Sequence, residues 1–146
     1  MRTVTIVALL ALPPLVAAAQ EKQIIQVPGA SLGLPFSTAV RVGNMIYLSG
    51  QIGTPPGSRQ LAPGGVGPET RQTLENIKRV LEHAGSSMDR VVKCTAFLQD
   101  IADYAAMNEV YATFFPEDPP ARSTVAGSGL ALGARVEIEC MAVAGP

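Results

Sequence analysis

One cation and two carboxylates occupy positions from which they could bind and transform a small polar molecule. Arg122 opens a predicted strand after a Pro-Pro-Ala segment, where its planar guanidinium could bind a carboxylate through two hydrogen bonds. Glu137 and Glu139 alternate along the last predicted strand, so both point to the same face. Burying two acids without partners is costly. The alternative interpretation is that both face solvent or pair structurally with Arg135 or Lys93.

Other reactive residue types lack the neighbours that their chemistry needs. His83 is the only histidine and lies near the end of a predicted helix, where it suits the helix dipole better than a metal. The Gly-Ser-Gly segment 127–129 joins two predicted strands, whereas a phosphate-binding loop leads from a strand into a helix. Ser49 has neither a nucleophile elbow nor a histidine base. The formal net charge of −1 provides no basic surface for nucleic acid.

The hydrophobic pattern predicts a mixed sheet with two helices. Leu74, Ile77 and Leu81 recur at helical spacing, with Pro68 suited to the first turn and Gly85 to the C-terminal cap. Gathering both helices on one face of the sheet is the economical arrangement, so the predicted fold class is α+β. The predicted elements are a hairpin over 39–52, helices over 68–84 and 100–115, and strands over 91–98, 122–126 and 135–143, with an irregular arm over 20–38 and a loop over 54–67.

Two sets of residues are expected to be covered. The buried stripe of the second helix is predicted to contain Ile101, Tyr104, Met107, Val110, Tyr111 and Phe114. The sheet face away from the helices is also predicted to be apolar. Its side chains, which alternate along two strands, are those of Val91, Thr95, Phe97, Met141 and Val143. An apolar face of this kind suggests contact with another subunit.

Residues 1–19 have the three parts of an export signal. Arg2 supplies a positive start, and the apolar run 4–12 is shorter than the stretch of about 20 residues that spans a bilayer. Small residues up to Ala19 form a cleavage site, which leaves a single domain over 20–146. The alternative is a membrane anchor, against which the short run argues. We expect the mature protein in the periplasm or outside the cell, without membrane attachment.

Cys94 and Cys140 each lie within a predicted strand. In an oxidising compartment they could form a disulfide, provided that the two strands are neighbours in the right register. Otherwise each is a buried free thiol, which is a common state for cysteine. The sequence leaves both alternatives open.

Segments along nearly the whole mature chain resemble the RidA family (reactive intermediate deaminase, also called the YjgF family). They occur in family order between about residues 27 and 143, and their combination is specific although each alone is weak. The matching segments are Pro35–Val40, Val42–Asn44, Leu48–Ile52, Thr70–Ile77, Ala84–Ser87, Asn108–Tyr111, Phe114–Pro116, Pro120–Thr124 and Val136–Glu139.

The resemblance implies a chorismate-mutase-like subunit that assembles as a homotrimer with sites between subunits. It also implies hydrolysis of enamine or imine intermediates, such as 2-aminoacrylate, to a 2-keto acid and ammonia without a cofactor or metal. Family roles place Arg122 on the substrate carboxylate and Glu137 at the hydrolytic water. Because imines hydrolyse readily, such a site mainly has to orient substrate and water. The residues implied to line the pocket are Phe36, Ser49, Gly50, Asn108 and Thr124.

Three positions depart from the family pattern. Phe36 stands where many relatives have Tyr, so the pocket lacks a hydroxyl, and Thr124 stands where Cys is frequent. The Leu-Ala-Leu-Gly segment 130–133 replaces a commoner Leu-Pro-x-Gly turn. The alternative hypothesis is a non-catalytic protein of the same fold that binds small carboxylates or acts as a chaperone. RNA cleavage, an activity attributed to some relatives, is disfavoured because a histidine pair and a basic stripe are missing.

Overall fold

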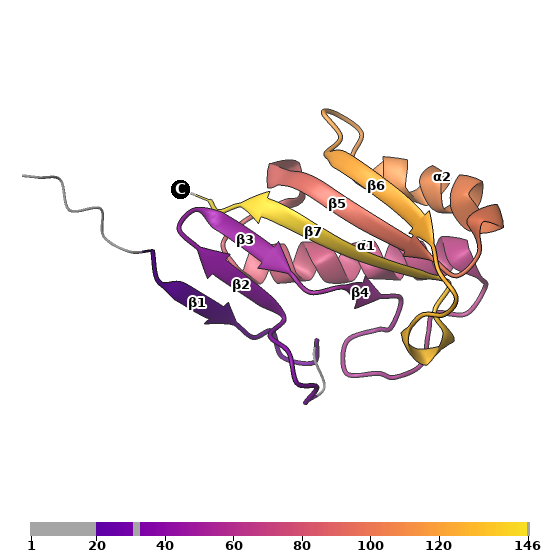
Figure 1. Cartoon of the computed structure of the whole chain (residues 1–146), viewed down its shortest axis with the longest axis horizontal. Helices are drawn as coiled ribbons and strands as arrows, with labels where there is room; N and C mark the ends of the chain where they lie inside the picture. The colour runs from indigo at the N-terminus through magenta and orange to yellow at the C-terminus, as the bar shows by residue number, and fades with distance from the viewer. Residues whose placement is uncertain (1–19, 31–32, 146) are drawn as a thin grey trace, which may run out of the picture.

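The computed structural model describes residues 20–30 and 33–145, and the predicted export segment lies outside the described residues. In this part of the chain, seven strands form one sheet in the order β1-β2-β3-β7-β5-β6, with β4 also paired to β7 (Figure 1). The β5–β6 pair is parallel and the other pairs are antiparallel. The strands are β1 (Lys22–Ile25), β2 (Ala39–Val42), β3 (Met45–Leu48), β4 (Gln51–Ile52), β5 (Val91–Leu98), β6 (Ala121–Ala126) and β7 (Val136–Val143).

Both helices, α1 (Val66–His83) and α2 (Tyr104–Phe114), cover the same face of the sheet (Figure 1). The core lies between them and the strands, where Leu74 and Ile77 of α1 and Ile138 of β7 are fully buried. The predicted α+β class, with a mixed sheet and two helices on one face, is therefore confirmed. None of the helices in the described residues is long and apolar enough to cross a membrane.

The end of α1 follows the predicted glycine cap. Gly85 has a φ of +73°, in the left-handed region that glycine adopts without a Cβ clash. Its amide donates to the carbonyl of Glu82 at 3.2 Å, and the Ser86 amide donates to the carbonyl of Leu81 at 2.8 Å. These two bonds form a Schellman motif, which satisfies carbonyls that the helix end leaves free.

Three local predictions were wrong. The segment predicted as an irregular arm contains β1, which pairs with β2 but is mostly exposed. In the predicted stripe of the second helix, only Met107 and Tyr111 are buried, while Ile101 is 59% and Tyr104 42% exposed. Ile101 belongs to a 3₁₀ turn before α2, so its spacing to the later residues is not helical. Val91 faces the core because the β5–β7 register shifts between Val91 and Lys93.

Cys94 of β5 and Cys140 of β7 lie directly opposite each other in the antiparallel pair and form a disulfide bond. Both residues are buried on the face of the sheet that the helices cover. The bond therefore joins the two longest strands of the sheet inside the core.

Polar contacts fix the beginning of β7 against both helices. The carboxylate of Asp103, just before α2, accepts two hydrogen bonds from the guanidinium of Arg135, each of 2.8 Å. The Glu69 side chain of α1 accepts a 2.8 Å hydrogen bond from the Arg135 amide. These bonds position the backbone two residues before Glu137.

Candidate active site

The arginine half-site consists of Arg122 and the side chains of α2 around it. Arg122 pairs with Cys94 across the parallel strands, so its side chain points to the helix-covered face. Its Nη2 donates to Asn108 Oδ1 at 2.6 Å and approaches the Tyr104 hydroxyl at 3.4 Å. Its guanidinium carbon lies 4.4 Å from the ring centroid of Tyr111, a cation–π distance. Arg122 is therefore held in one orientation by neutral groups.

These neutral neighbours leave the charge of Arg122 available to a ligand. Within the described residues, the one ion pair joins Arg135 to Asp103, so no carboxylate neutralises Arg122. An open cavity of about 490 Å³ lies beside it. Since a guanidinium binds a carboxylate through two parallel hydrogen bonds, the arrangement suits a small organic acid. The cavity is lined by Tyr104, Asn108, Tyr111, Ala112, Phe115, Pro119, Pro120, Arg122 and Thr124.

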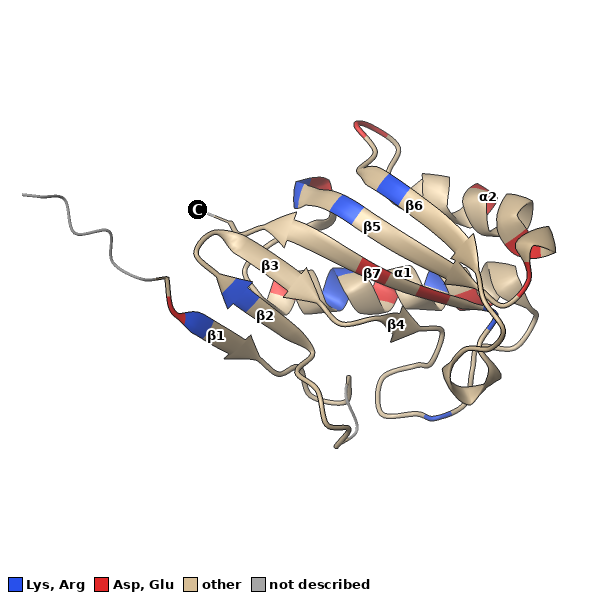
Figure 2. Ribbon diagram, in the orientation of Figure 1, with Lys and Arg blue, Asp and Glu red and all other residues tan. Residues whose placement is uncertain are grey.

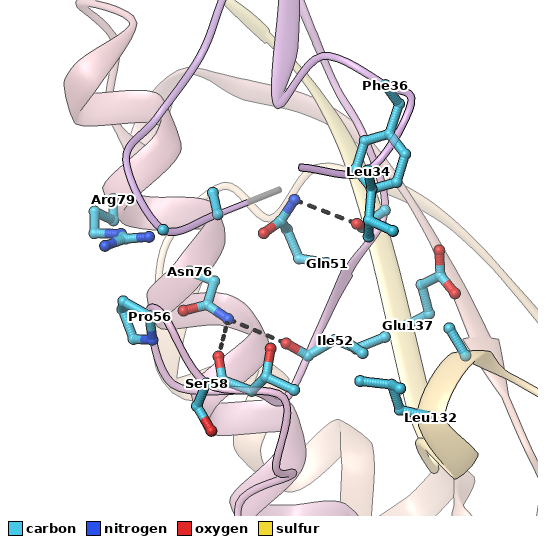
Figure 3. Close-up of a pocket in the computed structure, with 15 residues that line it drawn as sticks. Leu34, Phe36, Gln51, Ile52, Pro56, Ser58, Asn76, Arg79, Leu132 and Glu137 are labelled. Atoms are coloured by element: carbon cyan, nitrogen blue, oxygen red, sulfur yellow. Dashed lines mark hydrogen bonds between the residues drawn. The ribbon is translucent and has the colours of Figure 1, made fainter. Parts of the chain in front are cut away.

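The glutamate half-site is built around Glu137 of β7. Glu137 pairs with Phe97 of β5 and with Ile52 of β4, so its side chain points to the face that the helices do not cover. It borders a second cavity of about 190 Å³, where Leu34, Phe36 and Leu132 form an apolar wall near its carboxylate (Figure 3).

A hydrogen-bonded framework holds the backbone of the glutamate half-site. The side chain of Asn76 on α1 donates to the carbonyls of Ile52 and Thr54 at 3.1 and 2.8 Å (Figure 3). The side chain of Gln51 donates to the carbonyls of Ser49 and Gly50 at 3.1 and 3.2 Å. The strand end that carries Gly50 is thereby fixed next to Glu137.

The environment of Glu137 favours its neutral form. Burial, followed by repulsion from the neighbouring Glu139, raises the pKa of the Glu137 carboxyl. The cations considered as structural partners are engaged elsewhere, because Arg135 binds Asp103 and Lys93 donates to Ser123 at 2.7 Å. A carboxyl of raised pKa beside a cavity is suited to exchanging a proton with a bound water or substrate.

The backbone of Gly50 closely approaches the side chain of Glu137. A Cβ at this position would fall on the Glu137 carboxylate oxygen Oε1. We therefore expect Gly50→Ala to displace the Glu137 carboxylate with the fold retained. The rate of the enamine or imine hydrolysis that the family resemblance implies should then fall about 100-fold, as for a misplaced catalytic group. Gly127→Ala is the matched control, because a Cβ there meets no atom within 4 Å. Steady-state kinetics with circular dichroism tests this, and equal activity of both variants would contradict it.

The predicted site residues divide between the two half-sites. Asn108, Thr124 and Arg122 line the first cavity, while Phe36, Gly50 and Glu137 line the second. Ser49 adjoins Gly50, but its hydroxyl donates a 2.7 Å hydrogen bond to the carbonyl of Ser37 and so supports the backbone. The predicted site residues therefore lie around two separate cavities of the chain and do not line a single one.

The two half-sites lie on opposite faces of one sheet. Arg122 pairs with Cys94 and points, like that buried residue, to the face that the helices cover. Glu137 pairs with Phe97 and points to the opposite face. Figure 2 shows the acidic positions in the middle of the sheet on β7 and a basic position on the edge strand β6. A single chain therefore does not bring the arginine and the carboxylate onto the same small molecule.

Sequence reasoning missed Tyr104 and Tyr111 as site residues, because both were assigned to the helix core. Their spacing did contain a signal. Tyr104, Asn108 and Tyr111 follow one another at intervals of four and three residues, which places them on one face of a helix. A polar residue between two tyrosines on one face indicates a surface that binds a polar group.

Comparisons with known proteins agree with this fold. The family model described as Endoribonuclease L-PSP matches residues 29–144. A curated relative from Mus musculus, named 2-iminobutanoate/2-iminopropanoate deaminase, is 46% identical over 117 residues, which are 80% of this chain and 86% of the relative.

Solved structures of two bacterial proteins match over nearly their full lengths. RidA from the Antarctic bacterium Psychrobacter sp. PAMC 21119 is 39% identical with a TM-score of 0.78, covering 83% of this chain and 98% of that one. TdcF from E. coli, solved with bound serine, is 35% identical with a TM-score of 0.77 and the same coverage. The match over residues 29–144, together with the similarity in sequence and in fold, shows that the chain belongs to the Endoribonuclease L-PSP family, the YjgF/RidA family that its sequence resembles.

Proposed function

We propose that the protein is an imine deaminase that hydrolyses 2-imino acids and their enamine tautomers to 2-keto acids and ammonia. The observation that carries the proposal is Arg122, which neutral groups hold beside an open cavity and which has no carboxylate partner among residues 20–30 and 33–145. The chain is also 46% identical to a relative named as such a deaminase. The reaction needs only water as a second substrate. Orientation of that water and of the substrate carboxylate supplies most of the required catalysis.

Each half-site has a distinct role in this reaction. Arg122 binds the carboxylate of the substrate through its free guanidinium donors. Glu137 accepts a proton from the attacking water, and its raised pKa makes it a better base than an ordinary glutamate. The apolar wall of Leu34, Phe36 and Leu132 receives the carbon side chain of the substrate.

The proposed reaction requires a neighbouring copy of the chain, and we propose the homotrimer that the family resemblance implies. Its support is the placement of Arg122 and Glu137 on opposite sheet faces and the exposed apolar residues of the open face, which include Tyr47 (43% exposed), Val92 (44%) and Met141 (38%). Sedimentation equilibrium of the mature protein should give the mass of three chains. A monomer at assay concentration would contradict a site shared between subunits.

The function is tested by generating a 2-imino acid in situ with an amino-acid oxidase and following its loss in the presence of the purified protein. We expect faster loss than in buffer and no acceleration by Arg122→Ala. An active Arg122→Ala variant, or an inactive wild type that is folded and assembled, would contradict the proposal.

A second candidate function is binding of small carboxylates without turnover. It is favoured by the arginine half-site, which contains the cation, its supports and a cavity without any contribution from Glu137. The structure of the relative TdcF with bound serine is consistent with a ligand of this class. Calorimetry with pyruvate separates the two candidates, because binding without imine hydrolysis would favour this one.

The raised pKa of Glu137 gives a prediction for stability as well as activity. A folded-state pKa above the unfolded value means that this carboxyl favours folding at low pH, and the contribution is lost as the pH rises through the folded pKa. Glu137→Gln should therefore be inactive but more stable than the wild type at neutral pH, with the difference vanishing below about pH 4, where an ordinary glutamate is protonated.

Urea unfolding at a series of pH values measures this effect. Glu75→Gln, at an exposed position of α1, is the matched control and should change stability little at any pH. A Glu137→Gln protein that is less stable than the wild type at neutral pH would show that the carboxylate has a favourable partner in the assembly.

We also propose that the protein is exported. The sequence of residues 1–19 supports this, and so does the Cys94–Cys140 disulfide, because such bonds persist in oxidising compartments. Fractionation of cells that express the native gene should recover a chain beginning at Gln20 outside the cytoplasm. Recovery of the uncleaved chain in the cytoplasm would contradict export and leave the proposed reaction unaffected.

A further inference from the structure

We propose that Tyr104 is the proton donor to the substrate nitrogen in the arginine half-site, a role that rests on the proposed deaminase function. Neither the family pattern in the sequence nor the predicted site residues include this tyrosine. It is the first residue of α2, it lines the cavity beside Arg122, and it is 42% exposed. Its hydroxyl is therefore accessible to a small molecule bound at the guanidinium.

The hydrogen bonds around Tyr104 leave its own proton free. A guanidinium has donors and no acceptor, so the phenol oxygen is the acceptor in the 3.4 Å contact with Arg122 Nη2. Asn108 Oδ1 accepts a hydrogen bond from the same guanidinium. Since Arg122 is a donor to the phenol oxygen, the Tyr104 O–H group is left to donate into the cavity.

The position of the substrate follows from its chemistry. In a 2-imino acid, the carbon that bears the nitrogen is bonded directly to the carboxylate carbon. When the carboxylate lies on Arg122, the nitrogen must lie beside that guanidinium, within reach of a hydroxyl that contacts the same guanidinium. Glu137 of the neighbouring chain is then left to serve the water on the other side of the carbon.

The two tyrosines around Arg122 differ in a way that assigns different tasks to them. Hydrogen bonding by Asn108 and then by Arg122 lowers the pKa of Tyr104, which makes its phenol a stronger proton donor. Burial raises the pKa of Tyr111 to about 12, and its hydroxyl is buried without a partner among the described residues. Tyr111 therefore supports the guanidinium with its ring, and Tyr104 faces the ligand.

The proposed steps conserve atoms and charge. Glu137 takes a proton from water as the water oxygen bonds to the imine carbon, the C=N electron pair moves to nitrogen, and Tyr104 gives that nitrogen its proton. Glu137 then releases its proton to solvent water and Tyr104 takes one from it. In the carbinolamine, the C–N bond breaks as Tyr104 protonates the departing nitrogen to give ammonia, and Glu137 takes the hydroxyl proton as the ketone forms. A second exchange of one proton each with solvent returns both residues to their starting states.

The test compares Tyr104→Phe with Thr113→Val, which also removes a hydroxyl from α2 but at an exposed position where that hydroxyl donates to the Val110 carbonyl and lines neither cavity. Tyr104→Phe should lower kcat for imine hydrolysis about 100-fold, the scale of a lost general acid, with a much smaller change in KM. The wild type should lose activity at alkaline pH as the phenol ionises, and this limb of the pH profile should be absent in Tyr104→Phe. Thr113→Val should keep both the rate and the loss of activity at alkaline pH.

A readout without turnover separates this role from a structural one. Pyruvate presents a ketone oxygen where the substrate has nitrogen, so its Kd measured by calorimetry should rise about fivefold in Tyr104→Phe, as expected for one lost hydrogen bond, while thermal unfolding is unchanged. An active wild type with an equally active Tyr104→Phe variant overturns the role of Tyr104 alone. A wild type that does not accelerate imine loss overturns the proposed function and this role together.

Discussion

Mixing an Arg122→Ala chain with a Glu137→Gln chain is expected to restore imine hydrolysis that each variant alone lacks. The physical reason is the register of the sheet, which places the two side chains on opposite faces of every subunit. A working site must then combine Arg122 of one chain with Glu137 of its neighbour. In the mixed assembly, some neighbouring pairs contain an intact arginine half-site facing an intact glutamate half-site.

The size of the effect follows from counting chains in a closed ring. With equal amounts and random assembly, a site is intact when one chain keeps the arginine and the next keeps the glutamate, so about one quarter of the sites should be active. Co-refolding the two variants and measuring kcat per chain tests this. Each variant refolded alone should remain at the rate of the uncatalysed reaction.

A control mixture makes the result specific to a shared site. A chain that carries both substitutions is mixed with an equal amount of the wild type. If each site lies between two subunits, about one quarter of the sites in this mixture should also be active. If the site lay within one chain, the first mixture would be inactive and the control mixture would keep about half of the activity. That second pattern would contradict the shared site and the homotrimer proposal together.

The parts of the fold that could be predicted from the sequence are those with a local physical cause. Burial alternates along 93–98, and the observed strand, Val91–Leu98, has the predicted bounds. The apolar spacing of Leu74, Ile77 and Leu81 together with Gly85 predicted α1 and its end, because helix period and cap chemistry act over neighbouring residues. The edge strand β1 has four mostly exposed residues and lacks the alternation that reveals a strand.

The arrangement of the site could not be predicted in the same way. Arg122 and Glu137 were identified from residue type and position, but the face that each side chain occupies depends on which strands are neighbours and in which register. Because a shift of one residue moves every side chain of a strand to the opposite face, this information is not local. The pairing of Cys94 with Cys140 depends on the same register.

Reduction of the Cys94–Cys140 disulfide is expected to lower the free energy of unfolding by about 4 kcal/mol, from the loop-entropy relation. The bond closes a loop with a sequence separation of 46 residues that contains α2 and β6. It restricts the unfolded chain, which regains this freedom on reduction. Urea unfolding with and without a phosphine reductant measures the difference, and the slope with denaturant should rise because the reduced unfolded chain exposes more surface.

A chain with both cysteines replaced by alanine is the control, since its stability should not respond to the reductant. Stabilities of single domains are about 5–15 kcal/mol, so the disulfide accounts for a large share of the total. Cytoplasmic expression should therefore yield a protein with two free thiols and lower stability, and oxidation in vitro should restore the difference. If the wild type unfolds at the same urea concentration with its thiols free as with the disulfide formed, packing of β5 against β7 alone holds this part of the core.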